Sequence, residues 1–525
     1  MEKLNKSKIL FIIISLFYAI TNYIYWLLNT PILPYNVDAL HFMDIFKQNF
    51  LYYNAPLIPT IIKSSFYWLG LKYFDLIIIF INYIFFLAGL YCIYQIGKLI
   101  SSIKAGQISM ILFSLTPAVY SLSRFYGRQD YHVMIMIIVS IYCLIKTDFF
   151  KNRKWIILYS ISTTLGLLCK DSFIAYFIIP YIYIIFKSLK NNLSKTIFIN
   201  VILSFFIIIL FSSLHYLRPI IIFKLFFEPI SETETLNILQ SIYKLTFGLS
   251  QELFALPLFI LFIISIIWYL LKYNNTYKQL LFFWLFVPWI TLLLMQHYKD
   301  TIFCMGIIPP IILISSIYIT NINKQFVKQT LIYFFIIVGL LQFFEYSFNI
   351  NIGFNNLVVN YKGKKIYYFN KDINSINKNK KYIKVLNNLL AIIIKHHSEK
   401  IYIRYNTKNL ELKFIDFLNY MNLNGIFFNY DSLMSWTDCS TIDTIIYIGN
   451  YLTIKNQLEE YIKDIRDHPI SQMDNIDINH YSNEFLEFAT KRENYIKENF
   501  IVKYKFNLSD DLNNNIKVTI LIKNK

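Results

Sequence analysis

The chain has 525 residues, of which 56% are hydrophobic and only 16% are charged, and its net charge is +18. Soluble globular proteins carry about 25% charged residues, so this composition excludes a wholly soluble protein. The basic excess does not indicate a nucleic-acid partner, because cytoplasmic loops of membrane proteins collect Lys and Arg. The five cysteines form no CxxC pair, which argues against a disulfide framework or a zinc site.

The first predicted element is an uncharged run that begins at Ile9, after a short basic N-terminal segment. This run is too long for the core of a signal peptide, and no A-x-A cleavage site follows it. We therefore predict that it is an uncleaved first transmembrane helix.

Uncharged apolar runs of this kind recur up to about residue 350. A membrane-spanning helix needs about 20 such residues. We predict about eleven transmembrane helices, at residues 9–28, 76–96, 105–122, 131–145, 155–169, 172–186, 196–217, 253–271, 279–296, 301–322 and 329–344.

The fourth, fifth and sixth of these runs are short. A helix of roughly 15 residues covers about 22 Å, which is less than a hydrocarbon core of about 30 Å. Two explanations are open: flanking Lys and Arg side chains reach toward the interface, or the outer ends of these helices stop inside the membrane around a cavity.

Loop charges predict the orientation. With the N-terminus in the cytoplasm, the inside segments hold sixteen Lys and Arg residues against two acids, Glu2 and Asp148, whereas the longer outside segments hold ten basic residues. Basic residues carry the orientation signal. We therefore predict a multi-pass protein of the plasma (inner) membrane with a cytoplasmic N-terminus. An odd number of spans then places the C-terminal region outside, and a wrong assignment of one short span reverses this.

After residue 350 the pattern changes to short strand-like runs, at 365–369, 401–405, 426–429, 444–449, 501–506 and 516–522. Helix-period stretches at 382–394, 410–421 and 457–467 lie between several of them. This alternation is typical of a parallel α/β sheet, and the last two strands are predicted to form an edge hairpin around 509–514. We thus expect a transmembrane domain at 1–348 and an extracytoplasmic α/β domain at 349–525.

Charged residues gather at four outer ends of the predicted spans, at 36–41, 123–132, 169–172 and 296–300. Asp38 and Asp130 are candidates for a general base, because a carboxylate can accept the proton of an acceptor hydroxyl. Cations can stabilise the charge that develops on a phosphate leaving group. The candidates for that role are Arg124, Arg128, Lys170 and Lys299.

This set of residues indicates sugar transfer from a lipid-borne phosphate. The alternative for each residue is that it has no catalytic role and is charged simply because a loop between spans is exposed to water. For His41, His132 and His297 the spacing supports no metal site.

The order of these clusters resembles the membrane glycosyltransferases of the GT-C superfamily over roughly residues 1–320. Within it, the sequence is similar to the dolichyl-phosphate-mannose–protein mannosyltransferase branch, whose bacterial relatives include lipid A aminoarabinose transferases. The matching elements are Asp38-Ala39-Leu40-His41, Pro56-Leu57, Arg124 or Arg128 followed by Asp130, Lys170, and Tyr298-Lys299 followed by Pro309-Pro310.

The sequence departs from known motifs at three points, and these departures narrow the type of sugar transfer that we expect. The acidic motif has one Asp in place of an Asp-Glu pair, and Ala55 replaces the first Pro of a Pro-Pro-Leu element. The Trp-Trp-Asp motif of oligosaccharyltransferases is missing, since Trp436-Thr437-Asp438 does not match it. The resemblance therefore implies transfer of one sugar rather than of a preassembled oligosaccharide.

The resemblance implies a polyprenyl-phosphate sugar donor and a hydroxyl acceptor on a glycan, lipid or protein. Asp38 would be the leading catalytic carboxylate, and Asp130 would assist in positioning or proton transfer. Arg124, Arg128, Lys170 and Lys299 would bind the donor phosphate, with His41, Tyr298 and Asp171 as further pocket residues. Some relatives use a divalent metal, but this sequence establishes none.

Two other function classes stay open at this point. The first is a transporter or flippase of a lipid-linked glycan, which would place ionisable groups near the membrane midplane and often shows inverted repeats. The sequence shows neither feature clearly. The second is a non-catalytic membrane scaffold or sensor, for which replacement of the four charged clusters would leave surface glycans unchanged.

Overall fold

A computed structural model describes most of the first 350 residues and several strands beyond them. The described ranges are 2–29, 74–124, 129–170, 172–191, 194–216, 249–294, 301–348, 358–361, 364–367, 401–405, 444–448, 498–509 and 515–523, with a few single residues besides. The chain divides into two compact units, Met1–Ile376 and Asn377–Lys525. The predicted boundary between residues 348 and 349 stays a prediction.

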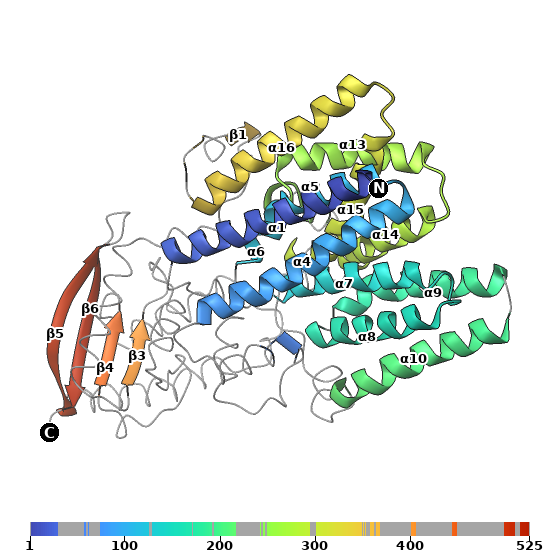
Figure 1. Cartoon of the computed structure of the whole chain (residues 1–525). Coiled ribbons are helices and arrows are strands. Elements are labelled where there is room, and N and C mark those ends of the chain that lie inside the picture. Colours follow the sequence, from blue (N-terminus) through green and yellow to red (C-terminus); the bar gives the residue numbers. More distant parts are fainter. Residues whose placement is uncertain are drawn as a thin grey trace. The chain divides into compact units, whose positions relative to one another are not determined.

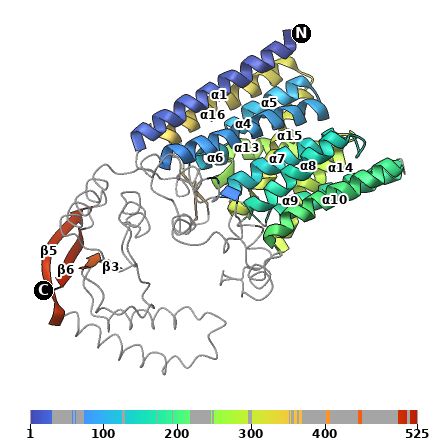
Figure 2. The same cartoon turned by 60° about the horizontal axis from the view of Figure 1, so that its bottom comes forward.

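The first unit is a bundle of helices (Figures 1 and 2). Its α-helices are α1 (Glu2–Asn29), α4 (Phe74–Ile100), α5 (Ile103–Ser114), α6 (Pro117–Leu122), α7 (Asp130–Lys146), α8 (Arg153–Cys169), α9 (Phe173–Asn191), α10 (Lys195–Tyr216), α13 (Leu256–Lys272), α14 (Lys278–Leu294), α15 (Ile308–Thr320) and α16 (Gln325–Phe348). A π-helical turn, η3 (Leu249–Leu253), precedes α13, and a 3₁₀-helix, η4 (Thr301–Ile307), precedes α15.

The prediction of a polytopic α-helical membrane protein is confirmed, since each predicted run falls on a described helix. By length and composition, five described helices can cross a membrane: Lys6–Leu27, Leu76–Ile100, Phe173–Lys190, Lys195–Ser213 and Gln325–Glu345. Four further apolar helices are shorter. The total of eleven spans stays a prediction.

Two of the predicted short runs, α7 and α8, remain short in the structure, with 17 residues each. Helix α7 lies inside the bundle, and its side chains from Asp130 to Ile138 are all buried. Protein rather than lipid therefore surrounds it, and a helix in such surroundings need not match the full thickness of the hydrocarbon core.

The predicted span at 105–122 is interrupted. Helix α5 ends at Ser114, and α6 starts at Pro117, which stands at the first helical position and has no N–H to donate. The Tyr18 hydroxyl of α1 donates a hydrogen bond to the Ser114 carbonyl at this break. A side chain thus satisfies a backbone group that would otherwise be unpaired in the membrane interior.

Two glycines allow α4 and α5 to approach closely. A Cβ atom added to Gly97 would lie 2.9 Å from the Cα of Gly106, and one added to Gly106 would lie 2.5 Å from the Tyr94 carbonyl oxygen. Small residues serve this purpose in membrane helix pairs, because backbone approach increases van der Waals contact.

The lysine-rich loops lie together at one end of the bundle, here called the basic end. Side-chain hydrogen bonds connect its loops and helix termini. They include Gln107 Nε2 to Ser7 Oγ (3.0 Å), Asn275 Nδ2 to the Ile100 carbonyl (3.0 Å), Lys187 Nζ to the Thr276 carbonyl (2.8 Å) and Asn200 Nδ2 to the Phe150 carbonyl (2.8 Å).

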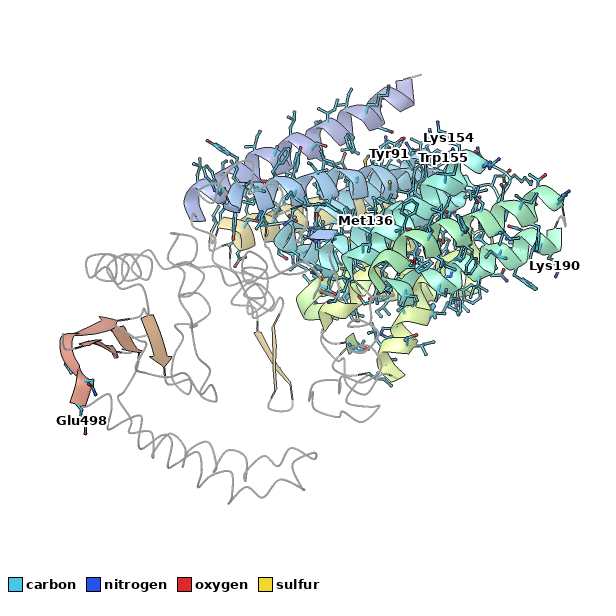
Figure 3. The ribbon with its side chains drawn as sticks, turned by 90° about the horizontal axis from the view of Figure 1, so that it is seen from below. Tyr91, Met136, Lys154, Trp155, Lys190 and Glu498 are labelled. Atoms are coloured by element: carbon cyan, nitrogen blue, oxygen red, sulfur yellow. The ribbon has the colours of Figure 1, made fainter. Side chains whose placement is uncertain are left out.

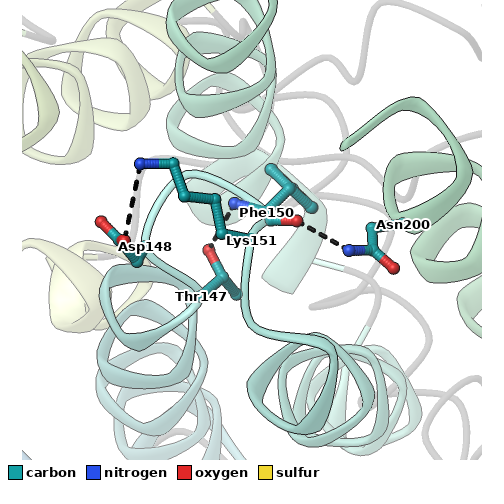
Figure 4. A network of polar contacts seen from close by, with 5 residues as sticks. All are labelled: Thr147, Asp148, Phe150, Lys151 and Asn200. Carbon is teal, nitrogen blue, oxygen red and sulfur yellow. Dashed lines mark hydrogen bonds and ion pairs between the residues drawn. The ribbon is translucent and has the colours of Figure 1, made fainter. Parts of the chain in front are cut away.

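The loop between α7 and α8 has an unusual backbone. Asp148, Phe149 and Phe150 have φ angles of 46°, 55° and 64°, a left-handed conformation that costs roughly 1–2 kcal/mol per residue. The Thr147 hydroxyl accepts a hydrogen bond from the Phe150 N–H, and Asn200 binds the Phe150 carbonyl (Figure 4). These bonds and the burial of the Phe150 side chain offset the strain.

The described strands form two sheets. In the first unit, β1 (Val358–Tyr361) pairs antiparallel with β2 (Lys364–Tyr367). The second unit contains a four-stranded sheet of order β3-β4-β6-β5, built from Ile401–Tyr405, Thr444–Ile448, Asn515–Lys523 and Phe500–Ser509. Its β3 and β4 are parallel, while β4–β6 and β5–β6 are antiparallel.

This sheet is therefore mixed rather than wholly parallel. The predicted hairpin accounts for the difference, because a short turn between β5 and β6 requires antiparallel strands. The predicted strand at 426–429 and the three predicted helices of this region lie outside the described residues.

Because α4 and α5 approach closely, one methyl group added between them should destabilise the protein. Gly106→Ala should lower stability by about 1–3 kcal/mol, because the new Cβ atom would clash with the Tyr94 backbone. The apparent melting temperature of the purified protein in detergent measures this. Ala88→Leu is the control, since Ala88 is exposed on α4. Equal melting temperatures for Gly106→Ala and the wild type would contradict the packing argument.

Candidate active site

Asp130 is the first residue of α7 and lies at the end of the helix opposite Lys146. A helix N-terminus carries a partial positive charge, so a carboxylate is favourable at this position. The Asp130 side chain is only 6% exposed. A carboxylate in such surroundings needs a partner of opposite charge.

That partner is Lys170, which terminates α8. Its backbone is extended, and the chain turns directly into α9. Gly166 makes this short connection possible, because a Cβ atom there would lie 2.2 Å from the Phe173 ring. The turn places the Lys170 side chain across the N-terminus of α7.

Lys170 Nζ lies 3.0 Å from each carboxylate oxygen of Asp130. The lysine keeps 24% of its side-chain surface exposed, whereas the aspartate is nearly covered. The ammonium group of Lys170 is therefore the accessible member of the pair, and the Asp130 carboxylate is covered. Charge-assisted bonds of this kind are stronger than neutral ones.

Arg124 follows the short helix α6 and is 2% exposed. Its Nε donates to Asn22 Oδ1 of α1 at 2.9 Å, and its Nη1 donates to the Ser347 hydroxyl of α16. The guanidinium carbon lies 4.9 Å from the ring centres of both Tyr25 and Phe343. Arg124 thereby connects α1 and α16 through hydrogen bonds and cation–π contacts.

A second polar contact involves His132, two residues after Asp130 on α7. His132 Nε2 is 2.8 Å from Asn82 Oδ1 on α4, and the imidazole is buried against Phe85. Sequence analysis did not single out Asn82, because an isolated Asn in an apolar run gives no spacing signal.

The 3₁₀-helix η4 contacts α7, α9 and α14 near the ion pair. Its Gly306 leaves room for Tyr176 of α9, whose ring would lie 2.5 Å from an added Cβ atom. The Tyr176 side chain is buried. Sequence analysis missed Tyr176, because in a chain with 42 tyrosines one more aromatic residue in an apolar span carries no signal.

Three of the nine predicted site residues lie within the described part of the chain: Arg124, Asp130 and Lys170. The structure brings Asp130 and Lys170 together and gives Arg124 partners on α1 and α16. The other six lie outside the described residues. They are Asp38, His41, Arg128, Asp171, Tyr298 and Lys299.

Among the described residues, no group of three His, Cys, Asp or Glu side chains is placed to hold a metal ion. Both carboxylate oxygens of Asp130 accept hydrogen bonds from Lys170 Nζ, and within the described residues no other carboxylate joins them in such a group.

Residues 54–216, just under a third of the chain, match a family model described as dolichyl-phosphate-mannose-protein mannosyltransferase. The resemblance predicted from the sequence is therefore confirmed. The matched segment contains Arg124, Asp130 and Lys170. No curated protein sequence matches this chain.

A solved structure shares the fold of this chain. The crystal structure of ArnT from Cupriavidus metallidurans bound to undecaprenyl phosphate aligns with a TM-score of 0.52 at 8% identity, over 96% of this chain and 97% of that one. The apo state of the same protein aligns with a TM-score of 0.47 at 10% identity, over 64% of this chain and 65% of that one, just under two thirds of its length.

The Archaeoglobus fulgidus oligosaccharyltransferase in complex with Zn and sulfate also aligns. Its TM-score is 0.48 at 12% identity, over 83% of this chain and 67% of that one.

Because Asp130 and Lys170 form an ion pair, the stability losses of their single variants should not add in the double variant. Asp130→Asn or Lys170→Met alone should each cost about 3–5 kcal/mol, because each leaves a largely buried charge without its partner. The double variant Asp130→Asn/Lys170→Met should recover most of this loss. Thermal unfolding of the four proteins completes a double-mutant cycle. Additive losses would mean that the two side chains do not depend on each other.

Proposed function

We propose that this chain is a glycosyltransferase that moves one sugar from a polyprenyl-phosphate-linked donor to a hydroxyl group of a glycan, lipid or protein. The observation that carries the proposal is the Asp130–Lys170 pair, at the bundle end opposite the basic end and within the segment matched by the mannosyltransferase family model. The fold shared with a structure bound to undecaprenyl phosphate supports this class of donor.

The chemistry explains why a partly exposed lysine suits this position. In the transfer, the bond between the sugar C1 atom and the phosphate oxygen breaks, and the electron pair stays on the departing polyprenyl phosphate. A cation fixed beside that oxygen lowers the barrier, because it needs no reorganisation when the charge develops. We assign this role to Lys170, oriented by Asp130.

Asp38 is the proposed general base. It would take the proton of the acceptor hydroxyl as the new bond between the acceptor oxygen and C1 forms. Asp38 belongs to the first outside loop, where the related family carries its acidic motif. In this scheme Asp130 holds Lys170 in place, and it does not compete for the proton.

The remaining predicted residues complete the proposal. Arg124, Arg128 and Lys299 would add positive charge around the donor phosphate, with Arg124 also connecting α1 and α16. His41, Tyr298 and Asp171 would line the sugar and acceptor pocket. A requirement for a divalent metal is not part of the proposal.

We also infer the orientation from the charges. The basic end would face the cytoplasm, because cytoplasmic loops are enriched in Lys and Arg. The proposed active site, the acceptor and the α/β domain at 349–525 would then lie outside the plasma (inner) membrane.

Replacement of the proposed base gives the most direct test. Asp38→Asn should lower transfer by about 10²- to 10⁴-fold, because the amide cannot accept the proton. The assay compares surface glycans and glycolipids by mass spectrometry in a deletion strain complemented with each variant. The matched control is Asp148→Asn, which makes the same substitution in an exposed loop at the basic end.

Each result of that assay decides between function classes. Full activity of Asp38→Asn would remove Asp38 from the catalytic role. Glycans that do not change in the deletion strain would instead favour the scaffold or sensor. For a flippase, a cysteine placed at position 38 would become accessible from both sides of the membrane, whereas a transferase exposes it to one side only.

A further inference from the structure

An aromatic and basic surface lies at the basic end of α4, α7 and α8, and the proposed transfer reaction makes no use of it. We call it the inner patch. It consists of Tyr91, Tyr142, Lys146, Arg153, Lys154 and Trp155. Figure 3 shows Tyr91, Lys154 and Trp155 in one region of the bundle surface, with Lys190 well apart from them.

The aromatic rings of the inner patch contact one another in series. Tyr91 of α4 meets Tyr142 of α7 edge-on, with ring centres 6.2 Å apart, and Tyr142 meets Trp155 of α8 at 5.4 Å. Tyr142 is buried beneath the other two rings, and Tyr91 is 46% exposed. Tyr and Trp at such a position favour the boundary between acyl chains and head groups.

Positive charge surrounds these rings. Lys146 Nζ lies 5.4 Å from the Trp155 ring centre, and Arg153 and Lys154 are exposed at the start of α8. The acidic residue of this loop, Asp148, lies 3.7 Å from Lys151, which offsets its charge. The inner patch therefore keeps an excess of three positive charges that its own loop does not neutralise.

An apolar strip continues from the charges toward the membrane interior. Leu158 and Ile161 of α8 are 39% and 44% exposed. They follow Lys154 by four and seven residues, so all three lie on one face of the helix. A ligand that contacts the whole surface must have an anionic group at one end and hydrocarbon at the other.

We propose that the inner patch binds an anionic phospholipid of the adjacent leaflet, with its phosphate between Lys146, Arg153 and Lys154 and an acyl chain along Leu158 and Ile161. Basic side chains near a membrane surface attract anionic lipids, and the adjacent rings confine the head group to this position. An acidic peptide would satisfy the charges, but it would leave the apolar strip uncovered. This site is independent of the transferase proposal, because it lies at the opposite end of α7 and α8 from Asp130 and Lys170.

Trp155 provides a local reporter for the test. The full chain is reconstituted into phosphatidylcholine vesicles that contain increasing brominated phosphatidylglycerol, or brominated phosphatidylcholine at the same mole fraction. Bromine quenches tryptophan fluorescence on contact. The chain has seven tryptophans, so the Trp155 signal is taken as the difference between wild type and Trp155→Phe.

We expect the anionic lipid to quench the Trp155 signal at a lower mole fraction than the neutral lipid. The variant Lys146→Gln/Arg153→Gln/Lys154→Gln should need about tenfold or more anionic lipid, since each basic residue contributes a several-fold factor. Lys154→Gln alone changes one exposed side chain and should show a several-fold shift. Lys190→Gln is the control, because it removes another exposed lysine that lies away from the rings.

Equal quenching by the two lipids would overturn the proposal. It would also fail if Lys154→Gln and the triple variant both kept the wild-type response. A shift in Lys190→Gln as large as that in Lys154→Gln would show general attraction to the basic end instead of a site.

Discussion

In the hydrocarbon core of a membrane, every backbone N–H and C=O group must find its partner within the protein, because no water is present to provide one. Continuous helices meet this constraint without help, and most of the described bundle consists of them. The places where the helices break are therefore informative. At the break between α5 and α6, the Tyr18 hydroxyl donates a hydrogen bond to the carbonyl of Ser114, the last residue of α5. The break allows the chain after α6 to bring Arg124 against α1 and α16.

The same scarcity of water controls the charged side chains. Asp130 lies at a helix N-terminus and has Lys170 across it, and the Arg124 guanidinium is placed between two aromatic rings. Each arrangement reduces the cost of holding a charge away from water. During catalysis, a positive charge that is held rigidly in a poorly hydrated site can also stabilise a negative charge that develops on the substrate. Stability and the proposed chemistry thus require the same geometry from these residues.

The two ends of the bundle present different chemistry to the membrane. At one end the two described cations, Arg124 and Lys170, each have a side-chain partner within the bundle, which suits recognition of one ligand in one orientation. At the basic end they are numerous and mostly exposed, and aromatic rings accompany them in the inner patch. Helix α7 connects the two ends, with Asp130 in its first turn and Lys146 in its last. A protein that works on lipid-borne substrates gains from stable depth and orientation in the bilayer, and the inner patch can supply both.

The sequence alone determined the membrane class, the positions of the helices and the candidate charges, because long apolar runs and their flanking basic residues are local signals. It also predicted five of the six described strands and the final hairpin. Tertiary structure decided which charges meet: Asp130 and Lys170 are 40 residues apart, and only the turn at Gly166 and Phe173 brings them together. It likewise decided that Arg124 joins two distant helices and that the sheet is mixed. These features depend on packing between remote segments, and spacing along the chain carries no record of such packing.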